Sequence, residues 1–154
     1  MEIVRSSYNA IPQLLRGSVT FAAGTTGAIA QHTVFTITGM VAFNFFARCT
    51  DPLTSGGAAT ISHGNVVNVA DLGAATTATT IDADDSLTHG SSAWIEAANF
   101  GQENLGTWMT STGTDIIADI LTATITGGTL EYYLFWQAIS VGATVALGAE
   151  LTQI

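Results

Sequence analysis

The sequence predicts an all-β protein, an antiparallel β-sandwich of jelly-roll-like architecture with an N-terminal arm. Apolar and polar residues alternate over an unusual length between Thr33 and Cys49, and a period of two is typical of a half-buried strand. Glycine-rich turn signals recur along the chain and no segment has a helical period. Many short strands with such turns are expected to stack as two sheets.

The chain divides into three parts. Residues 1–16 contain Ile and Leu without a clear period, and Pro12 limits any helix there. We expect this segment to be an arm that docks on a neighbouring protein. Residues 17–140 carry the strand patterns of the sandwich domain. Residues 141–154 are mostly small or apolar and are expected to form a final strand or a C-terminal arm.

Within the domain the first strand is expected at Ser18–Phe21. Gly39 divides the run from Thr33 to Cys49, which indicates either two strands joined by a tight turn or one strand bent at a bulge. Thr50-Asp51-Pro52 is expected to end this run. Further strands are expected at 59–62, 66–69 and 76–81.

The strongest local pattern lies near the C-terminus. Two β-rich runs, 120–126 and 129–139, flank Gly127-Gly128, which predicts a hairpin with a primed turn. In the second run Leu130, Tyr132, Leu134 and Trp136 share one face, and Tyr133, Phe135 and Ile139 share the other. A strand that is apolar on both faces is covered on both. One face is therefore expected to meet the core and the other a partner or a covering loop.

The composition is unusual for a free monomer. The 154 residues include no lysine, and 10% are charged, against about a quarter in an ordinary soluble domain. A surface with so little charge favours self-association, so we expect a homo-oligomeric assembly subunit.

The net charge of −9 and a total of three Arg residues argue against nucleic acid as the main ligand. No apolar run approaches the length needed to span a bilayer, so no membrane partner is expected.

Motifs for catalysis are missing from the sequence. Without lysine neither a P-loop nor a Schiff base can form, and the sequence contains no Gly-x-Gly and no Gly-x-Ser-x-Gly.

The three histidines are isolated in sequence, which favours surface or interface positions over a zinc site. Asp82-Ala83-Asp84-Asp85 favours an Asp-capped turn over a calcium site. Cys49, the lone cysteine, is expected to be a buried apolar residue. We therefore expect no catalytic residue, cofactor or metal.

Four stretches together resemble a known group of proteins. They are Thr33–Gly39, Ala58–Ser62, Ala75–Asp84, and Ile125–Gly128 with Tyr132 and Trp136 following. They resemble small β-rich virion structural proteins of tailed bacteriophages, over about residues 17–139. The resemblance implies a capsid-associated subunit of the decoration or cement type, often a trimer. Its partners would be the major capsid protein or other virion proteins, in a particle assembled in the host cytoplasm.

These observations lead us to expect a non-enzymatic virion subunit that binds and stabilises the head lattice. An alternative is a tail- or fibre-associated receptor or carbohydrate-binding module that uses the loop tryptophans Trp94 and Trp108. The residues expected to bind a partner are Arg5, Ile11, Leu14, Leu15 and Arg16 of the arm, and Trp108 of the glycine-punctuated loop at 97–115.

Overall fold

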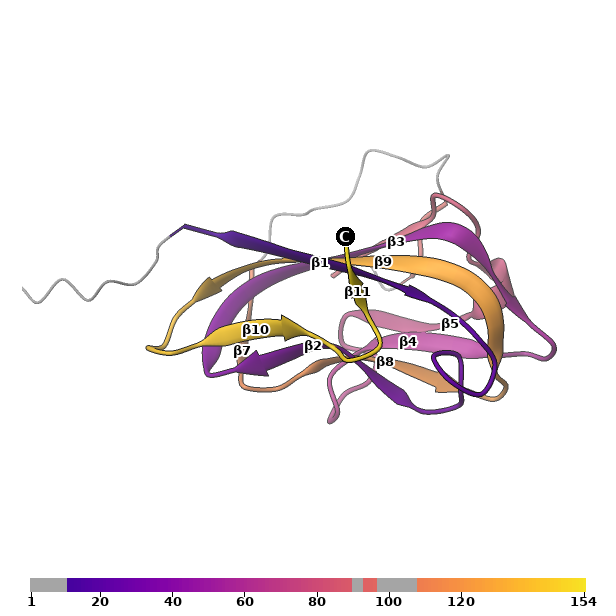
Figure 1. The fold of residues 1–154 in the computed structure, drawn as a ribbon, viewed down its shortest axis with the longest axis horizontal. Coiled ribbons are helices and arrows are strands. Elements are labelled where there is room, and N and C mark those ends of the chain that lie inside the picture. The colour runs from indigo at the N-terminus through magenta and orange to yellow at the C-terminus, as the bar shows by residue number, and fades with distance from the viewer. Residues whose placement is uncertain (1–10, 90–92, 97–107) are drawn as a thin grey trace, which may run out of the picture.

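The fold is two antiparallel β-sheets packed face to face, shown by a computed structural model that describes residues 11–89, 93–96 and 108–154 (Figure 1). Sheet A has the order β11 (Thr152–Gln153), β1 (Gln13–Thr20), β9 (Ile125–Ala138), β3 (Met40–Ser55), β6 (Ser86–Thr88), and β7 (Met109–Thr112) also pairs with β3. Sheet B has the order β10 (Thr144–Leu147), β2 (Gln31–Thr38), β8 (Ile116–Leu121), β4 (Thr60–Gly64), β5 (Gly73–Thr77). The all-β sandwich predicted from the sequence is confirmed.

Most successive strands lie in opposite sheets, and the exceptions are β4–β5 in sheet B and β6–β7 in sheet A. The chain passes from β1 in sheet A to β2 in sheet B, back to β3 in sheet A and on to β4 in sheet B. Strands that are neighbours in sequence therefore seldom pair with each other, and most ladders join distant segments. The jelly-roll-like arrangement of the strands stays a prediction.

The core lies between the sheets and is built from the inward residues of each strand. The predicted apolar face of the 33–49 run is buried, with Phe35 from sheet B and Phe45 from sheet A both inaccessible to solvent. β9 contributes Leu130, Tyr132 and Leu134 from the same side. Each fully buried side chain of this size stabilises the fold by about 1.5–3 kcal/mol, so the core explains why 154 residues hold without a disulfide.

Gly39 joins two strands, the first of the two arrangements predicted for it. Its φ of +74° turns the chain out of β2 and into β3. The two strands do not pair with each other, because they belong to different sheets. A Cβ on residue 39 would lie 2.8 Å from the Ser140 hydroxyl oxygen and 3.1 Å from Ala143, because the connection between β9 and β10 packs directly against Gly39.

The hairpin predicted at Gly127-Gly128 is wrong. Both glycines lie inside β9, and the preceding strand β8 belongs to the other sheet. The pairing of β9 with β3 is irregular beside them, between Asp51 and Ser55. The predicted strand end at Thr50-Asp51-Pro52 is also wrong, because β3 continues to Ser55 through this irregular stretch. Glycine is needed in β9 because its backbone meets that of β3 closely here, not because the chain reverses.

We predict that Gly128→Ala destabilises the protein by at least about 1 kcal/mol more than Gly142→Ala, since overpacking typically costs about 1–3 kcal/mol. Both residues have a positive φ, +102° and +75°, so both substitutions carry backbone strain. A Cβ at residue 128 would lie 2.5 Å from the Pro52 carbonyl oxygen, whereas nothing lies within 4 Å at residue 142. Urea denaturation measures the two losses, and equal losses would show that the close approach is unimportant.

Two other predicted strands differ from the structure. Residues 66–69 form a turn, because the Asn65 Oδ1 accepts hydrogen bonds from the amides of Val67 at 2.8 Å and Asn68 at 2.9 Å. Such Asx bonding offers the backbone an alternative to a sheet ladder. The strand expected at 76–81 ends at Thr77 and continues as a 3-10 turn, Ala78–Thr80.

The segments at both chain ends join the sandwich. β1 begins at Gln13, three residues before the predicted end of the arm, and pairs with β9 from Gln13↔Trp136 to Thr20↔Thr129. The last residues contribute β10 to sheet B and β11 to sheet A. Residues 141–154, for which we expected a final strand or an arm, contribute two short strands.

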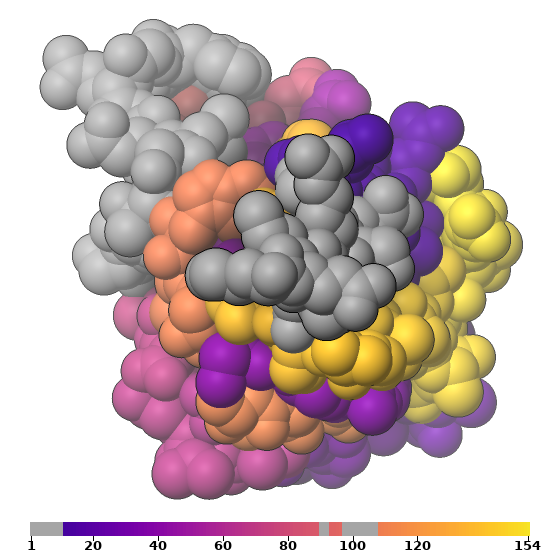
Figure 2. Space-filling view, turned by 90° about the vertical axis from the view of Figure 1, so that its left-hand side faces the viewer, coloured from indigo at the N-terminus to yellow at the C-terminus, as the bar shows by residue number. Residues whose placement is uncertain are grey.

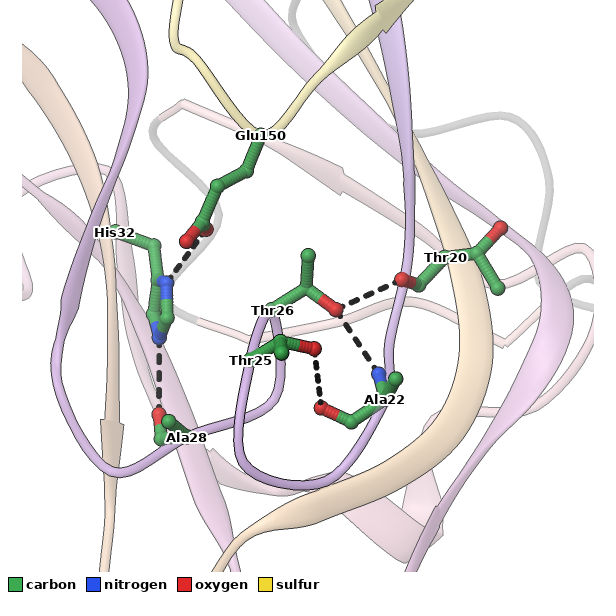
Figure 3. A network of polar contacts seen from close by, with 7 residues as sticks. All are labelled: Thr20, Ala22, Thr25, Thr26, Ala28, His32 and Glu150. Carbon is green, nitrogen blue, oxygen red and sulfur yellow. Dashed lines mark hydrogen bonds and ion pairs between the residues drawn. The ribbon is translucent and has the colours of Figure 1, made fainter.

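A polar network holds the connection between β10 and β11 (Figure 3). Glu150 Oε2 lies 2.7 Å from His32 Nδ1, and the other ring nitrogen of His32 lies 2.9 Å from the Ala28 carbonyl oxygen. Beside it, the Thr26 hydroxyl donates to the Thr20 carbonyl at 2.9 Å. The C-terminal strands are therefore tied to β2 and to the loop between β1 and β2.

Candidate interaction surface

The side of sheet A that faces away from the core carries large apolar side chains. Strand register aligns Leu14, Phe135 and Asn44 in one row across β1, β9 and β3, and Arg16, Tyr133 and Phe46 in the next. A third row contains Ser18, Glu131 and Arg48. We call these three rows, together with Met40, Trp108 and Ile139, the outer face of sheet A.

The apolar members of the outer face are open to solvent. The exposed fractions are 49% for Leu14, 41% for Phe135 and 43% for Trp108. The Phe46 and Tyr133 rings lie half-buried in the next row, with centroids 5.5 Å apart. Large apolar side chains gathered on one exposed face mark interaction sites, and here the buried Asn44 lies between Phe135 and Trp108.

Trp108, Met40 and Ile139 extend this surface to one end of the sandwich. Met109 pairs with Phe43 and points inward, so Trp108 falls beside the Phe135 row on the outward side. The Ile139 amide donates to the Met40 carbonyl at 2.8 Å. Figure 2 looks at this end and shows β7, the β2–β3 turn and the segment after β9 side by side.

The polar part of the outer face holds both described arginines. Arg16 Nε donates to the Ile154 carbonyl at 2.7 Å. Arg48 forms an ion pair with Asp84, and the hydrogen bond to that carboxylate raises the pKa of the guanidinium. The Tyr133 hydroxyl donates to Glu131 Oε2 at 2.5 Å, and burial together with this bond raises the pKa of the phenol.

The outer face is balanced in charge and the remaining described surface is not. Its members Arg16, Arg48 and Glu131 sum to +1, and Asp84, the ion-pair partner of Arg48, brings the formal sum to zero. The other described ionisable residues, histidines aside, are all acidic: Asp51, Asp71, Asp82, Asp85, Glu96, Asp115, Asp119 and Glu150. Any surface outside the outer face is therefore neutral or negative within the described part of the chain.

Three of the residues expected to bind a partner meet on the outer face. Leu14, Arg16 and Trp108 lie there, whereas Leu15 points inward and packs against the core. Ile11 is exposed just before β1, and Arg5 lies outside the described residues. The sequence spacing did not show that Leu14 and Trp108 share a surface. The sequence contained one indication of this surface, the second apolar face of β9. Phe135 belongs to that face and lies between Leu14 and Trp108.

The histidine expectation is wrong for two of the three residues. His63 and His89 are buried, not at the surface. His63 Nε2 lies 3.0 Å from the Tyr132 hydroxyl, and Phe45 and Trp94 pack around the imidazole with ring centroids 6.0 Å away. Burial lowers the pKa of His63 to about 3 and raises that of Tyr132. His63 is thus a neutral member of the core at physiological pH.

The remaining candidates for chemistry have structural roles. Cys49 is buried, which raises the pKa of its thiol to about 11, so little reactive thiolate forms. Asp85 Oδ2 accepts a hydrogen bond from the Asp82 amide at 2.9 Å, as expected of an Asp-capped turn. Among residues 11–89, 93–96 and 108–154 no three His, Cys, Asp or Glu side chains are grouped to hold a metal. In the same ranges no helix has the length and hydrophobicity to cross a membrane.

A cavity of about 170 Å³ opens beside β7 and the turn that follows β4. Its polar walls bond to one another. Asn65 donates to Asp71 at 3.1 Å, the Ile37 amide donates to Asp115 at 2.9 Å, and Ser111 donates to the Thr114 carbonyl at 2.9 Å. These groups have protein partners, so the outer face of sheet A is the stronger candidate site.

Comparison with known proteins yields structural neighbours only. No protein-family model matches the chain, and a search of curated proteins finds no match. The fold is similar to a chain of the cyanophage Pam1 capsid asymmetric unit, at 16% identity over 82% of this chain and 84% of that one, with a TM-score of 0.44. It is also similar to a chain in an acidic stable capsid structure of Helicobacter pylori bacteriophage KHP30, at 11% identity over 88% and 93%, with a TM-score of 0.44. At these identities and TM-scores neither match assigns a function.

Proposed function

We propose that this protein is a non-enzymatic structural component of a bacteriophage virion, a decoration or cement subunit that binds the head lattice. The observation that carries the proposal is the outer face of sheet A, where Leu14, Phe135 and Trp108 are exposed together. The lysine-free composition supports it, since a surface poor in charge suits a protein that works inside an assembly. Residues 17–139 resemble small phage virion proteins, and this resemblance is the reason for proposing a phage particle as the assembly.

Such a subunit would act by binding energy alone. A protein that bridges neighbouring coat subunits binds the assembled shell and not the separated subunits. Preferential binding of this kind stabilises the bound state by about 2.7 kcal/mol when the free ligand is at 100 times its dissociation constant. Rupture of the shell must then break the cement contacts as well.

A density map of the purified particle tests the proposal. The sandwich should fit density on the outside of the head, in contact with more than one coat subunit. Density on the tail or a fibre would instead support the receptor-binding alternative, in which the exposed Trp108 contacts a host glycan. Absence of the chain from the purified particle would overturn both.

Removal of residues 1–12 is expected to weaken attachment to the particle and to leave the domain folded. This deletion spares β1, which begins at Gln13. Co-sedimentation with particles stripped of the subunit measures attachment, and circular dichroism measures folding. Attachment as tight as that of the full chain would exclude a docking role for the arm.

Deletion of residues 1–16 serves as the comparison. It also removes Gln13 to Arg16, whose backbone pairs with β9 from Trp136 to Tyr133. We expect this longer deletion to lower the melting temperature as well, which separates loss of the arm from loss of the strand.

A further inference from the structure

We infer that the cavity beside β7 binds a lysine or arginine side chain of a different protein. The inference does not depend on the proposed virion role, and no member of the outer face of sheet A lines this cavity. The cavity measures about 170 Å³, whereas pockets for whole small molecules measure about 300–1,000 Å³. It therefore has room for one side chain and not for a cofactor.

Two carboxylates line the cavity, and neither has a cation partner in the part of the chain that the structure describes. Asp115 Oδ1 accepts a hydrogen bond from the Ile37 amide at 2.9 Å. Asp71 accepts hydrogen bonds from the side-chain amides of Asn65 and Asn68. All of these donors are neutral, so both negative charges remain uncompensated. A cleft lined by charge of one sign concentrates its field and attracts the opposite charge, which makes a cation the complementary ligand.

The other walls of the cavity suit the alkyl part of a cationic side chain. Four apolar residues contribute to the lining: Phe43, Leu72, Met109 and Ile116. Lysine and arginine pack their stems along apolar surface while the charged end keeps polar partners. A metal ion has no use for apolar walls, and within the described ranges no three His, Cys, Asp or Glu side chains are grouped to hold one. The mixed lining therefore favours a long cationic side chain.

The turn beside the cavity offers a contact surface for the protein that carries this side chain. Val66 and Val67 are 57% and 89% exposed and lie in sequence between the lining residues Asn65 and Asp71. The Asn65 amide donates to the Asn68 carbonyl at 2.9 Å, and the Asn65 side chain accepts from the Val67 amide at 2.8 Å. A turn held in this way loses little conformational entropy when a partner binds. Exposed valines next to the cavity favour a protein over a free amine.

The composition of the chain identifies the occupant as a different protein. A second copy cannot supply a lysine, because the sequence contains none. Arg16 donates to the Ile154 carbonyl at 2.7 Å, and Arg48 forms an ion pair with Asp84. A second copy could therefore offer only Arg5 without giving up one of these contacts. A foreign lysine or arginine meets no such restriction.

NMR titration of the isotope-labelled protein with Nα-acetyl-lysine methylamide tests the inference. This probe carries the ammonium group and the alkyl stem of a lysine within a protein. It should shift the backbone amides of residues 65–72 and 109–116 in a saturable way. The form of the probe that is also acetylated at Nε keeps the stem and loses the charge. It should bind at least about fivefold more weakly, since loss of the cation removes its attraction to the carboxylates.

The variant Asp115→Asn and its control Asp51→Asn each remove one negative charge. An asparagine at residue 115 can still accept the hydrogen bond from the Ile37 amide. Asp51 is exposed on β3 and does not line the cavity. Asp115→Asn should weaken binding of the lysine probe at least about threefold, and Asp51→Asn should leave it unchanged. Circular dichroism confirms folding, and Asp71→Asn replaces Asp115→Asn if that variant does not fold.

Any other result overturns the inference. The absence of a saturable shift up to about 50 mM probe, equal binding of the uncharged probe, or equal losses in the two variants would each do so. Calcium that shifts the same amides and displaces the probe would assign the cavity to a metal ion. Cavity amides that shift when residues 1–12 are deleted would assign it to Arg5 of this chain or of a second copy. A chain that binds the probe as expected but is absent from the purified particle would overturn only the proposed function.

Discussion

Trp136→Ala should lower the free energy of unfolding by about 3–5 kcal/mol, the usual range for truncating a buried tryptophan. Trp136 lies at the centre of sheet A, paired with Gln13 of β1 on one side and Phe43 of β3 on the other, and is 8% exposed. Its truncation removes buried apolar area and leaves a cavity between the sheets. Both effects act on the folded state, so the unfolding rate should rise as well.

Trp108→Ala is the matched control. The same side chain is removed, but from the outer face, where 43% of it is exposed. Substitutions at exposed positions usually change stability by about 0.5 kcal/mol or less. Chemical denaturation of the two variants under identical conditions measures both values. Equal losses would mean that Trp108 belongs to the core, and the outer face would lose one of its apolar members.

Acidification from pH 6.5 to pH 4 should cost about 3 kcal/mol of stability through His63 alone. Burial lowers the pKa of this histidine to about 3 in the folded protein, whereas a histidine in an unfolded chain titrates near pH 6.5. Below pH 6.5 the unfolded state therefore binds a proton that the folded state does not. Stability falls by about 1.4 kcal/mol for each pH unit in that window. The loss levels off below about pH 3, where the folded state also binds the proton.

His63→Gln isolates this contribution. Glutamine does not titrate and can still bond the Tyr132 hydroxyl, which lies 3.0 Å from the His63 ring in the wild type. All other ionisable residues are the same in both proteins, so the difference between their stability curves reports residue 63. We expect the wild-type curve to fall more steeply between pH 6.5 and pH 4. Parallel curves would show that His63 is accessible to protons in the folded state.

The candidate site was only partly visible in the sequence. The alternation of β9 showed that Phe135 and Tyr133 lie opposite the core, and Leu14, Arg16 and Trp108 were selected because they had no evident place in it. These residues lie on one surface because β1 pairs with β9 and β7 pairs with β3, on either side of the β9–β3 pair in sheet A. Leu15 was selected with Leu14, but alternation along β1 turns it inward.

The failed hairpin prediction has a physical cause. Gly127-Gly128 was interpreted through local turn rules, under which a strand pairs with its neighbour in sequence. In this fold β2 and β3 lie in opposite sheets, as do β8 and β9. Gly128 thus permits a close backbone approach to β3 near the start of a long strand, where Gly127 lies against the Thr54 side chain. A glycine needed for close approach cannot be distinguished by sequence from one needed for a turn.

By itself, the sequence determined that the protein is an all-β sandwich, that the 129–139 strand is apolar on both faces, and that few of its residues are charged. These properties follow from the period and chemistry of the side chains, which are local. The tertiary structure alone decided which strands pair, that His63 lies in the core, and that the described arginines and the exposed Phe135 share one face. Those properties depend on contacts between residues far apart in the chain. Such contacts form together when the two sheets bury their inner faces, and no short sequence pattern encodes them.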